Sequence, residues 1–168
     1  MMIKMTSIVS ILLDVFNHEA DQALFVLKVA SETDLGFKPR EDMRNLGALA
    51  NHLAQIPSLD PSMYMREIDS PEKAQEWEKQ LKRETIDEMV KVFQKGIEDV
   101  NGMFKSMTDT DFLEKKLKPF YSDGESKAWD YYFPEMIAHI AMHKMQLWMY
   151  LKLAGEDVNM MTYYGIPT

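Results

Sequence analysis

Apolar residues recur with the period of an α-helix over most of the chain, and no segment reads convincingly as a β-strand. In residues 5–31 they fall on one arc when successive residues turn by about 100°. The members of that arc are Ile8, Leu12, Val15, Phe16, Ala23, Val26, Leu27 and Ala30. Two further helices are expected over residues 42–56 and 126–154, ended by a proline and a glycine respectively.

The longest predicted element is a third helix, placed between those two in chain order and running over residues 71–107. Ser70 is suited to cap its start, and Pro71 is suited to its first position. Its apolar side consists of Trp77, Leu81, Met89, Val92, Phe93, Val100, Met103 and Phe104. Gly96 is a candidate kink within it.

The segments between these helices predict connections rather than further long elements. Residues 57–71 contain three prolines and three serines, which is typical of an irregular loop. The tail, residues 155–168, carries methionines and tyrosines, so we expect it to pack on the other helices. The prediction is one all-α domain over residues 1–168, a four-helix bundle.

The composition and charge narrow the classes of function. The chain has 168 residues, 46% of them hydrophobic, and is long enough to bury a sizeable core. Its net charge of −8 repels phosphate backbones, so no nucleic-acid partner is expected. No apolar run approaches the ~20 residues that span a bilayer. Asp14 interrupts the short apolar run near the N-terminus, so we expect a cytoplasmic protein without a signal peptide.

Cysteine is absent from the sequence. Its absence excludes disulfides, thiolate ligands and a cysteine nucleophile. A metal site in this chain must therefore use nitrogen and oxygen donors. Thiol chemistry would need a thiol supplied by a small molecule.

Two of the histidines, His139 and His143, are spaced to share one face of the helix at 126–154. That face also carries large apolar residues, and buried imidazoles need either hydrogen-bond partners or a metal. Both alternatives are open. His52 lies at the edge of the buried face of the helix at 42–56 and is the candidate third ligand. Three histidines leave one metal position open, as in catalytic sites, and zinc or nickel is the expected ion.

Candidate acid, base and supporting groups are few. Ile140 stands where a zinc metalloprotease helix needs its glutamate base, so protease chemistry is not expected. Glu19 lies on the apolar arc of residues 5–31, where it either reaches a buried lysine or water, or faces a polar site as a catalytic carboxylate. Glu135 and Gln146 flank the histidine pair, either as hydrogen-bond partners of the ligands or as solvent-facing residues.

Two segments in a fixed order carry a family resemblance. They are Gly47-Ala-Leu-Ala-Asn-His-Leu-Ala-Gln-Ile-Pro57, and His139-Ile-Ala-Met-His-Lys-Met-Gln-Leu147 followed by Tyr150-Leu-Lys-Leu-Ala-Gly155. Over nearly its whole length the chain resembles the DinB/YfiT-like superfamily of metal-binding four-helix bundles. The resemblance implies an up-down-down-up bundle, a metal held by His52, His139 and His143, and a homodimer. Lys144-Met145 departs from the Arg-Gly step that many members carry, which leaves the subfamily open.

The resemblance also defines the functions to be considered. Characterised relatives include transferases that join a low-molecular-weight thiol to an electrophile, which makes a metal-dependent thiol transferase the first hypothesis. The second is a metal-dependent hydrolase that activates water, for which Glu19 is the one core-facing carboxylate that the sequence offers. The third is a non-enzymatic, stress-related module that binds metal and dimerises. A helical bundle without any metal is the remaining alternative.

Overall fold

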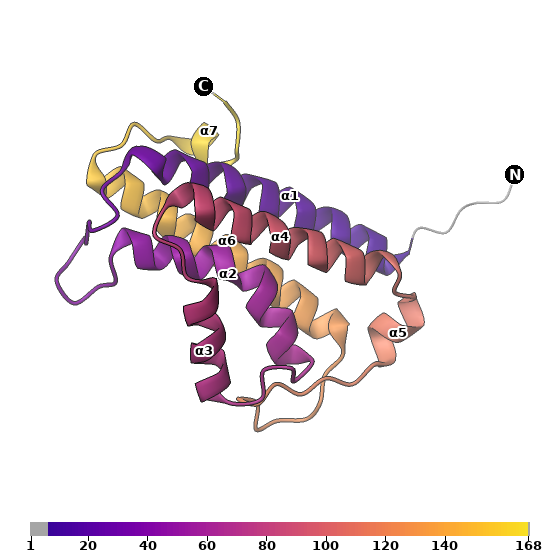
Figure 1. Ribbon diagram of the computed structural model, residues 1–168. Helices are drawn as coiled ribbons and strands as arrows, with labels where there is room; N and C mark the ends of the chain where they lie inside the picture. The colour runs from indigo at the N-terminus through magenta and orange to yellow at the C-terminus, as the bar shows by residue number, and fades with distance from the viewer. Residues whose placement is uncertain (1–6, 168) are drawn as a thin grey trace, which may run out of the picture.

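The centre of the fold is a bundle of four long helices (Figure 1). They are α1 (Ile8–Val29), α2 (Leu46–Tyr64), α4 (Ile86–Lys105) and α6 (Trp129–Ala154). The computed structural model describes residues 7–167, and in it α1 and α2 each pack against both α4 and α6. The shorter helices are η1 (Ala30–Glu32), α3 (Pro71–Leu81), α5 (Asp109–Glu114) and α7 (Met160–Tyr163). The described residues form no strand, so the predicted all-α bundle is confirmed.

The first helix is capped by Ser7, whose side chain accepts a hydrogen bond from the backbone N–H of Ser10. Residues 5 and 6 of the predicted helix lie outside the described residues. Part of the predicted apolar arc was wrong, because Ile8 and Val15 are 43% and 47% exposed. The buried stripe at this end runs through Val9 and Leu13, which were not in the predicted arc, and through Phe16, which was. It is offset by one residue because that side of α1 meets α4 and α6.

The second helix does not end at Pro57, as the sequence predicted, but continues to Tyr64 with Pro57 and Pro61 inside it. Each proline removes one backbone donor from the helix, which normally interrupts it. Here both prolines are buried in the bundle, together with Leu59 and Tyr64. Tertiary packing of this last segment therefore outweighs the lost hydrogen bonds. The extension matters for the site because it brings residues 57–64 alongside α6.

The predicted long third helix is also wrong, since residues 71–107 form two helices. Ser70 caps α3 as expected, but the backbone leaves the helix at Lys82, and Thr85 caps a new helix, α4. Asn51 of α2 holds the linker between them: its side chain accepts from the Arg83 N–H at 2.8 Å and donates to the Arg83 carbonyl at 2.8 Å. These long-range bonds favour the break. In Figure 1, α3 projects away from the bundle axis.

The last long helix ends where predicted, at Gly155, whose φ of +96° suits glycine. The tail then returns over the bundle, with α7 packed against α1 and α6. The indole N–H of Trp148 donates to the Asn159 carbonyl at 3.0 Å, which attaches the tail to α6. The prediction of a packed tail is thus confirmed. In residues 7–167, every helix is too short or too polar to cross a membrane.

Candidate metal centre

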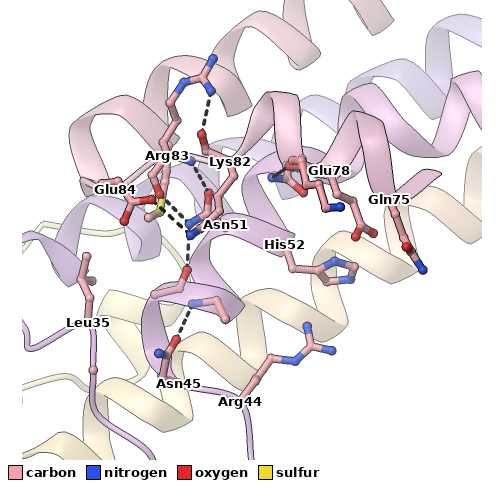
Figure 2. A pocket seen from close by; sticks show the side chains of 16 residues that line it. Leu35, Arg44, Asn45, Asn51, His52, Gln75, Glu78, Lys82, Arg83 and Glu84 are labelled. Carbon is pink, nitrogen blue, oxygen red and sulfur yellow. Dashed lines mark hydrogen bonds and ion pairs between the residues drawn. The ribbon is translucent and has the colours of Figure 1, made fainter. Parts of the chain in front are cut away.

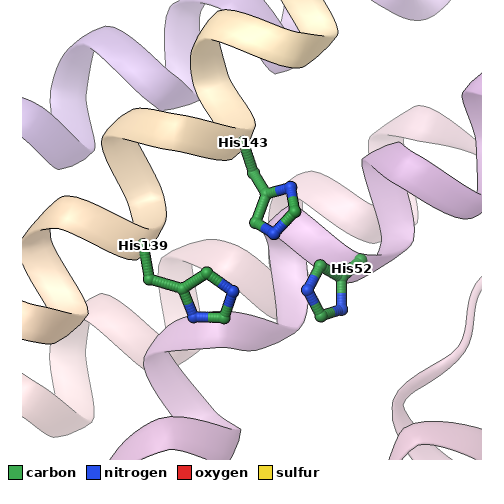
Figure 3. A group of neighbouring side chains, drawn as sticks. All are labelled: His52, His139 and His143. Carbon is green, nitrogen blue, oxygen red and sulfur yellow. The ribbon is translucent and has the colours of Figure 1, made fainter.

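Three histidines meet where two helices of the bundle face each other (Figure 3). His52 comes from α2, and His139 and His143 come from α6. One nitrogen from each ring lies within 4.8 Å of the corresponding nitrogens of the other two rings. The ring centroids of His52 and His143 are 4.5 Å apart, and those of His139 and His143 are 4.8 Å apart. The structure therefore brings together the residues that the sequence grouped as metal ligands.

Hydrogen bonds orient two of these imidazoles. The Nδ1 atom of His139 lies 2.8 Å from Oδ2 of Asp60, and Nδ1 of His143 lies 2.7 Å from Oε1 of Gln146. Carboxylate and amide oxygens accept hydrogen bonds, so each Nδ1 carries the hydrogen. Nε2 of each ring is left with a free lone pair. This is the arrangement of metal-ligating histidines, whose other ring nitrogen is held by an oxygen.

Burial keeps the site in the protonation state that a metal requires. Burial first, and then the neighbouring imidazoles and the positive charge of Arg44, together lower the pKa of His52 from 6.5 to about 4. Burial also lowers the pKa of His143. Both imidazoles are therefore neutral at pH 7, and neutral imidazole is the form that binds a metal. The donor set fits a divalent late transition metal such as zinc or nickel.

The sequence did not identify Asp60, which is only 2% exposed and supports His139. Its Oδ2 also accepts a hydrogen bond from the Tyr64 hydroxyl at 3.3 Å, and the Tyr64 ring stacks on Tyr132. Burial and the Asp60 charge raise the pKa of Tyr64, so its hydroxyl stays protonated. Asp60 was missed because residues 57–70 were predicted to be a loop. Its position eight residues after His52, about two helical turns, was the available signal.

Of the two residues that flank the histidine pair, Gln146 is the hydrogen-bond partner of His143, which was one of the two alternatives for it. Glu135 makes no hydrogen bond to a histidine but lines a pocket together with His139 and Asp60. Burial, followed by the charge of Asp60, raises the pKa of Glu135. A carboxyl group with a raised pKa beside the cluster is a candidate proton donor or acceptor.

Glu19 does not join the histidines. Its Oε1 lies 2.7 Å from the ammonium of Lys144, which is 1% exposed and sits over the Tyr163 ring at 4.1 Å. The structure thus supplies the buried lysine that was one of the two alternatives for Glu19. A catalytic role for Glu19 stays a prediction, and among residues 7–167 no ion pair joins its carboxylate to the three histidines. His18, the fourth histidine, is exposed and does not belong to the three-histidine group.

The cluster borders two pockets. The wider one, of about 740 Å³, includes His52 and is enclosed by the start of α2, by α3 and by the linker after α3 (Figure 2). The narrower one, of about 440 Å³, includes His139 and Asp60. Its other lining residues are Met63, Tyr64, Tyr121, Glu135, Ala138 and Met142. The histidines are therefore approached from one polar, charged pocket and from one pocket with largely apolar walls.

Comparison with known proteins adds no assignment to this geometry. The chain matches no protein-family model, and no curated protein is similar to it in sequence. What stands is an all-helical bundle with a three-histidine cluster that could bind a metal.

Proposed function

We propose that His52, His139 and His143 bind one divalent metal ion, zinc or nickel, and that the chain is a metal-dependent transferase. Its substrates would be a low-molecular-weight thiol and a small electrophile. The observation that carries the metal assignment is the pair of hydrogen bonds that hold Nδ1 of His139 and of His143. They leave both Nε2 atoms free for a metal in the same small space as His52.

The two pockets support a reaction between two substrates. The thiol would enter the wider pocket beside His52, and the electrophile would occupy the more apolar pocket beside His139. When bound, the ion supplies a Lewis acid that lowers the pKa of a thiol at its open position. Asp60 and Gln146 orient the imidazoles, and the aromatic side chains of Tyr64 and Tyr121 line the electrophile side. The absence of cysteine agrees with an external thiol.

The resemblance to the DinB/YfiT-like superfamily supports the same proposal. On the basis of this resemblance we also propose an up-down-down-up topology, a homodimer and a cytoplasmic location. Sedimentation velocity of the purified chain tests the homodimer. A single species with the mass of one 19.6 kDa chain at micromolar concentration would contradict it.

Elemental analysis of protein purified without an affinity tag is the first test of the metal. We expect about one equivalent of zinc or nickel in the native chain. The His143→Ala variant should lose it, while His18→Ala should retain it because His18 is exposed and outside the cluster. Equal metal content in all three proteins would refute the three-histidine site.

The transferase reaction is then tested with the metal-loaded protein, a small thiol and a chromogenic electrophile. Thiol consumption should be faster than with His52→Ala, and it should depend on both substrates. A bound metal without any rate above that variant, over a panel of thiols and electrophiles, would favour the non-enzymatic module.

A metal-dependent hydrolase is the second candidate function. The position of the Glu135 carboxyl group beside the histidines favours it. Its carboxyl group has a raised pKa and lines the pocket beside His139, where it could transfer a proton to or from water. Hydrolysis of an activated ester without any thiol, reduced in Glu135→Gln at unchanged metal content, would support this reading over the transferase.

A further inference from the structure

Positive side chains gather around the wider pocket, although the chain as a whole has a net charge of −8. The pocket lining contains Arg44, Lys79, Lys82 and Arg83. It contains only two acidic residues, Glu78 and Glu84. A local excess of positive charge on an acidic protein attracts anions to this pocket rather than to the rest of the surface.

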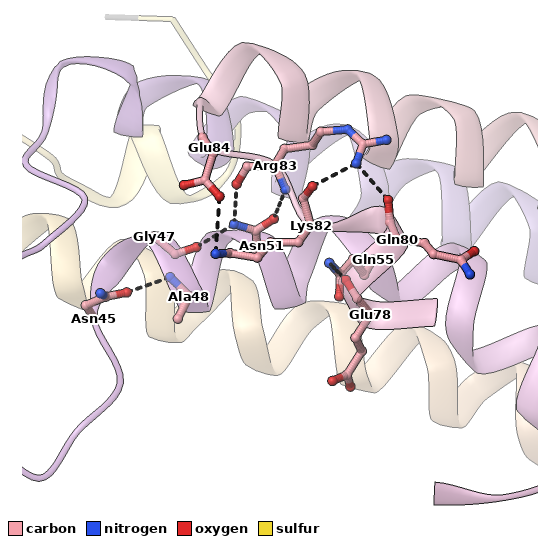
Figure 4. Close-up of polar contacts among 10 residues, drawn as sticks. All are labelled: Asn45, Gly47, Ala48, Asn51, Gln55, Glu78, Gln80, Lys82, Arg83 and Glu84. Atoms are coloured by element: carbon pink, nitrogen blue, oxygen red, sulfur yellow. Dashed lines mark hydrogen bonds and ion pairs between the residues drawn. The ribbon is translucent and has the colours of Figure 1, made fainter. Parts of the chain in front are cut away.

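Two of these cations already have partners within the protein (Figure 4). The guanidinium of Arg83 donates to the carbonyls of Gln80 and Lys82, at 2.8 and 2.7 Å, where α3 ends. The ammonium of Lys82 lies 3.2 Å from Glu84. The side chains of Arg44 and Lys79, in contrast, make no hydrogen bond or ion pair within residues 7–167, so both are available to a ligand.

Arg44 is placed to act beside the histidines. Figure 2 shows its guanidinium directed toward the ring of His52. Its main chain is anchored, because the Tyr150 hydroxyl donates to the Arg44 carbonyl at 3.2 Å. Arg44 and His52 line the same pocket, which places the guanidinium on the histidine side of it (Figure 2). A cation in this position opposes metal binding unless an anion lies between the two.

The backbone at the start of α2 does not offer its first N–H groups to a phosphate. Phosphate is commonly bound by the free N–H groups at a helix start. Here the N–H of Leu46 donates to the Phe37 carbonyl at 2.9 Å, and the N–H of Gly47 donates to the Leu35 carbonyl at 2.8 Å. The next N–H, of Ala48, donates to the side chain of its capping residue at 2.8 Å. What remain are the guanidinium of Arg44 and the ammonium of Lys79, and the planar guanidinium can pair with both oxygens of a carboxylate.

We propose that the wider pocket binds a small molecule bearing a carboxylate, with Arg44 as the residue that recognises it and Lys79 as a second cation at the rim. This proposal rests on the proposed function, because it assigns a chemical class to the thiol substrate of the same site. That substrate would be a thiol that also carries a carboxylate. Its carboxylate pairs with Arg44 while its thiol reaches the histidine side of the pocket.

Isothermal titration calorimetry tests the assignment with 3-mercaptopropionate and its neutral amide, on protein with and without zinc. Wild-type protein should bind the carboxylate about tenfold more tightly than the amide, as expected for one charge-assisted contact. Arg44→Gln should abolish most of this preference without changing the melting temperature, because the Arg44 side chain has no internal partner. Arg40→Gln is the matched control, since Arg40 is exposed and pairs with Asp42.

The outcomes separate the two proposals. Equal affinity of the wild type for acid and amide, or a preference that survives Arg44→Gln, would overturn the carboxylate subsite. Tighter binding of inorganic phosphate than of the carboxylate would overturn it as well. If zinc does not bind but the preference for the carboxylate persists and depends on Arg44, the subsite stands and the metal-dependent function fails.

Discussion

The residues that hold the imidazoles decide how well the three histidines can bind a metal. The two holding residues differ: Asp60 is charged and 2% exposed, whereas Gln146 is neutral and exposed. A buried carboxylate on Nδ1 fixes the ring and raises the basicity of the other nitrogen. An exposed amide can be replaced by water at little cost. His139 should therefore depend on its partner more strongly than His143 does.

Replacement of Asp60 by asparagine tests this difference. We expect Asp60→Asn to weaken zinc affinity about 10- to 100-fold, as removal of such supporting partners typically does. Gln146→Ala should weaken it less, because solvent can bond to Nδ1 of His143. Competition with a chromogenic chelator measures both affinities, and circular dichroism checks the fold. Equal losses in the two variants would show that Asp60 has no special role.

The low pKa of His52 predicts how the metal-free protein responds to acid. Its folded-state value of about 4 lies below the ordinary 6.5, so the unfolded chain binds more protons between these values. The resulting stability is complete above about pH 6.5 and is lost as the pH falls toward about 4. The lowered pKa of His143 acts in the same direction. Urea unfolding at pH 7.5 and at pH 5 should show wild type losing about 1–2 kcal/mol more than His52→Gln. Identical losses would contradict it.

At the scale of the elements, the crossing of α2 and α4 decides the shape of the bundle near the site. Gly96 of α4 faces Pro57 and Ser58 of α2. A Cβ atom at Gly96 would lie 2.9 Å from Cβ of Pro57 and 2.9 Å from Oγ of Ser58, which is too close. Gly96 therefore allows close packing and does not break α4. The same close contact buries Pro57 within α2.

An alanine pair tests that contact. Gly96→Ala should destabilise the fold by about 1–3 kcal/mol, because the helices must move apart. Gly102→Ala in the same helix should stabilise it by about 0.5–1 kcal/mol, since nothing lies within 4 Å and alanine favours helix. Thermal unfolding of both variants gives the comparison. A neutral or stabilising Gly96→Ala would mean that the α2–α4 distance is not limited by this glycine.

At the scale of the whole molecule, one buried cation connects three elements. Lys144 of α6 pairs with Glu19 of α1, bonds to the side-chain oxygen of Gln22 and lies over Tyr163 of α7. It therefore joins the tail to the bundle from inside. Breaking such a buried pair leaves an uncompensated charge, which is more unfavourable than losing a surface pair.

Lys144→Met should lower the free energy of unfolding by about 3 kcal/mol. It should also speed hydrogen exchange in residues 155–167, because the tail loses its anchor. Lys95→Met is the control, since Lys95 pairs with Asp99 on the surface and should change stability by less than about 1 kcal/mol. An effect of Lys144→Met as small as that of the control would show that the tail is held by other contacts.

The sequence by itself determined the features that depend on neighbours within about one helical turn. Helical periodicity, the caps at Ser70 and Gly155, and the shared face of His139 and His143 all follow from spacing along the chain. His52 could be proposed as their partner because it lies at the edge of a buried face. Each of these properties is local, so it can be predicted before the helices are packed.

Only the tertiary structure decided the features in which distant segments compete with local preferences. Packing kept Pro57 inside α2, and Asn51 favoured the break before α4 by bonding to Arg83. The contact of Asp60 with His139 joins residues 79 positions apart, and it exists only because α2 continues past Pro57. Such contacts depend on which helix faces meet, and that is set by the burial of the whole core rather than by the spacing of residues in any one segment.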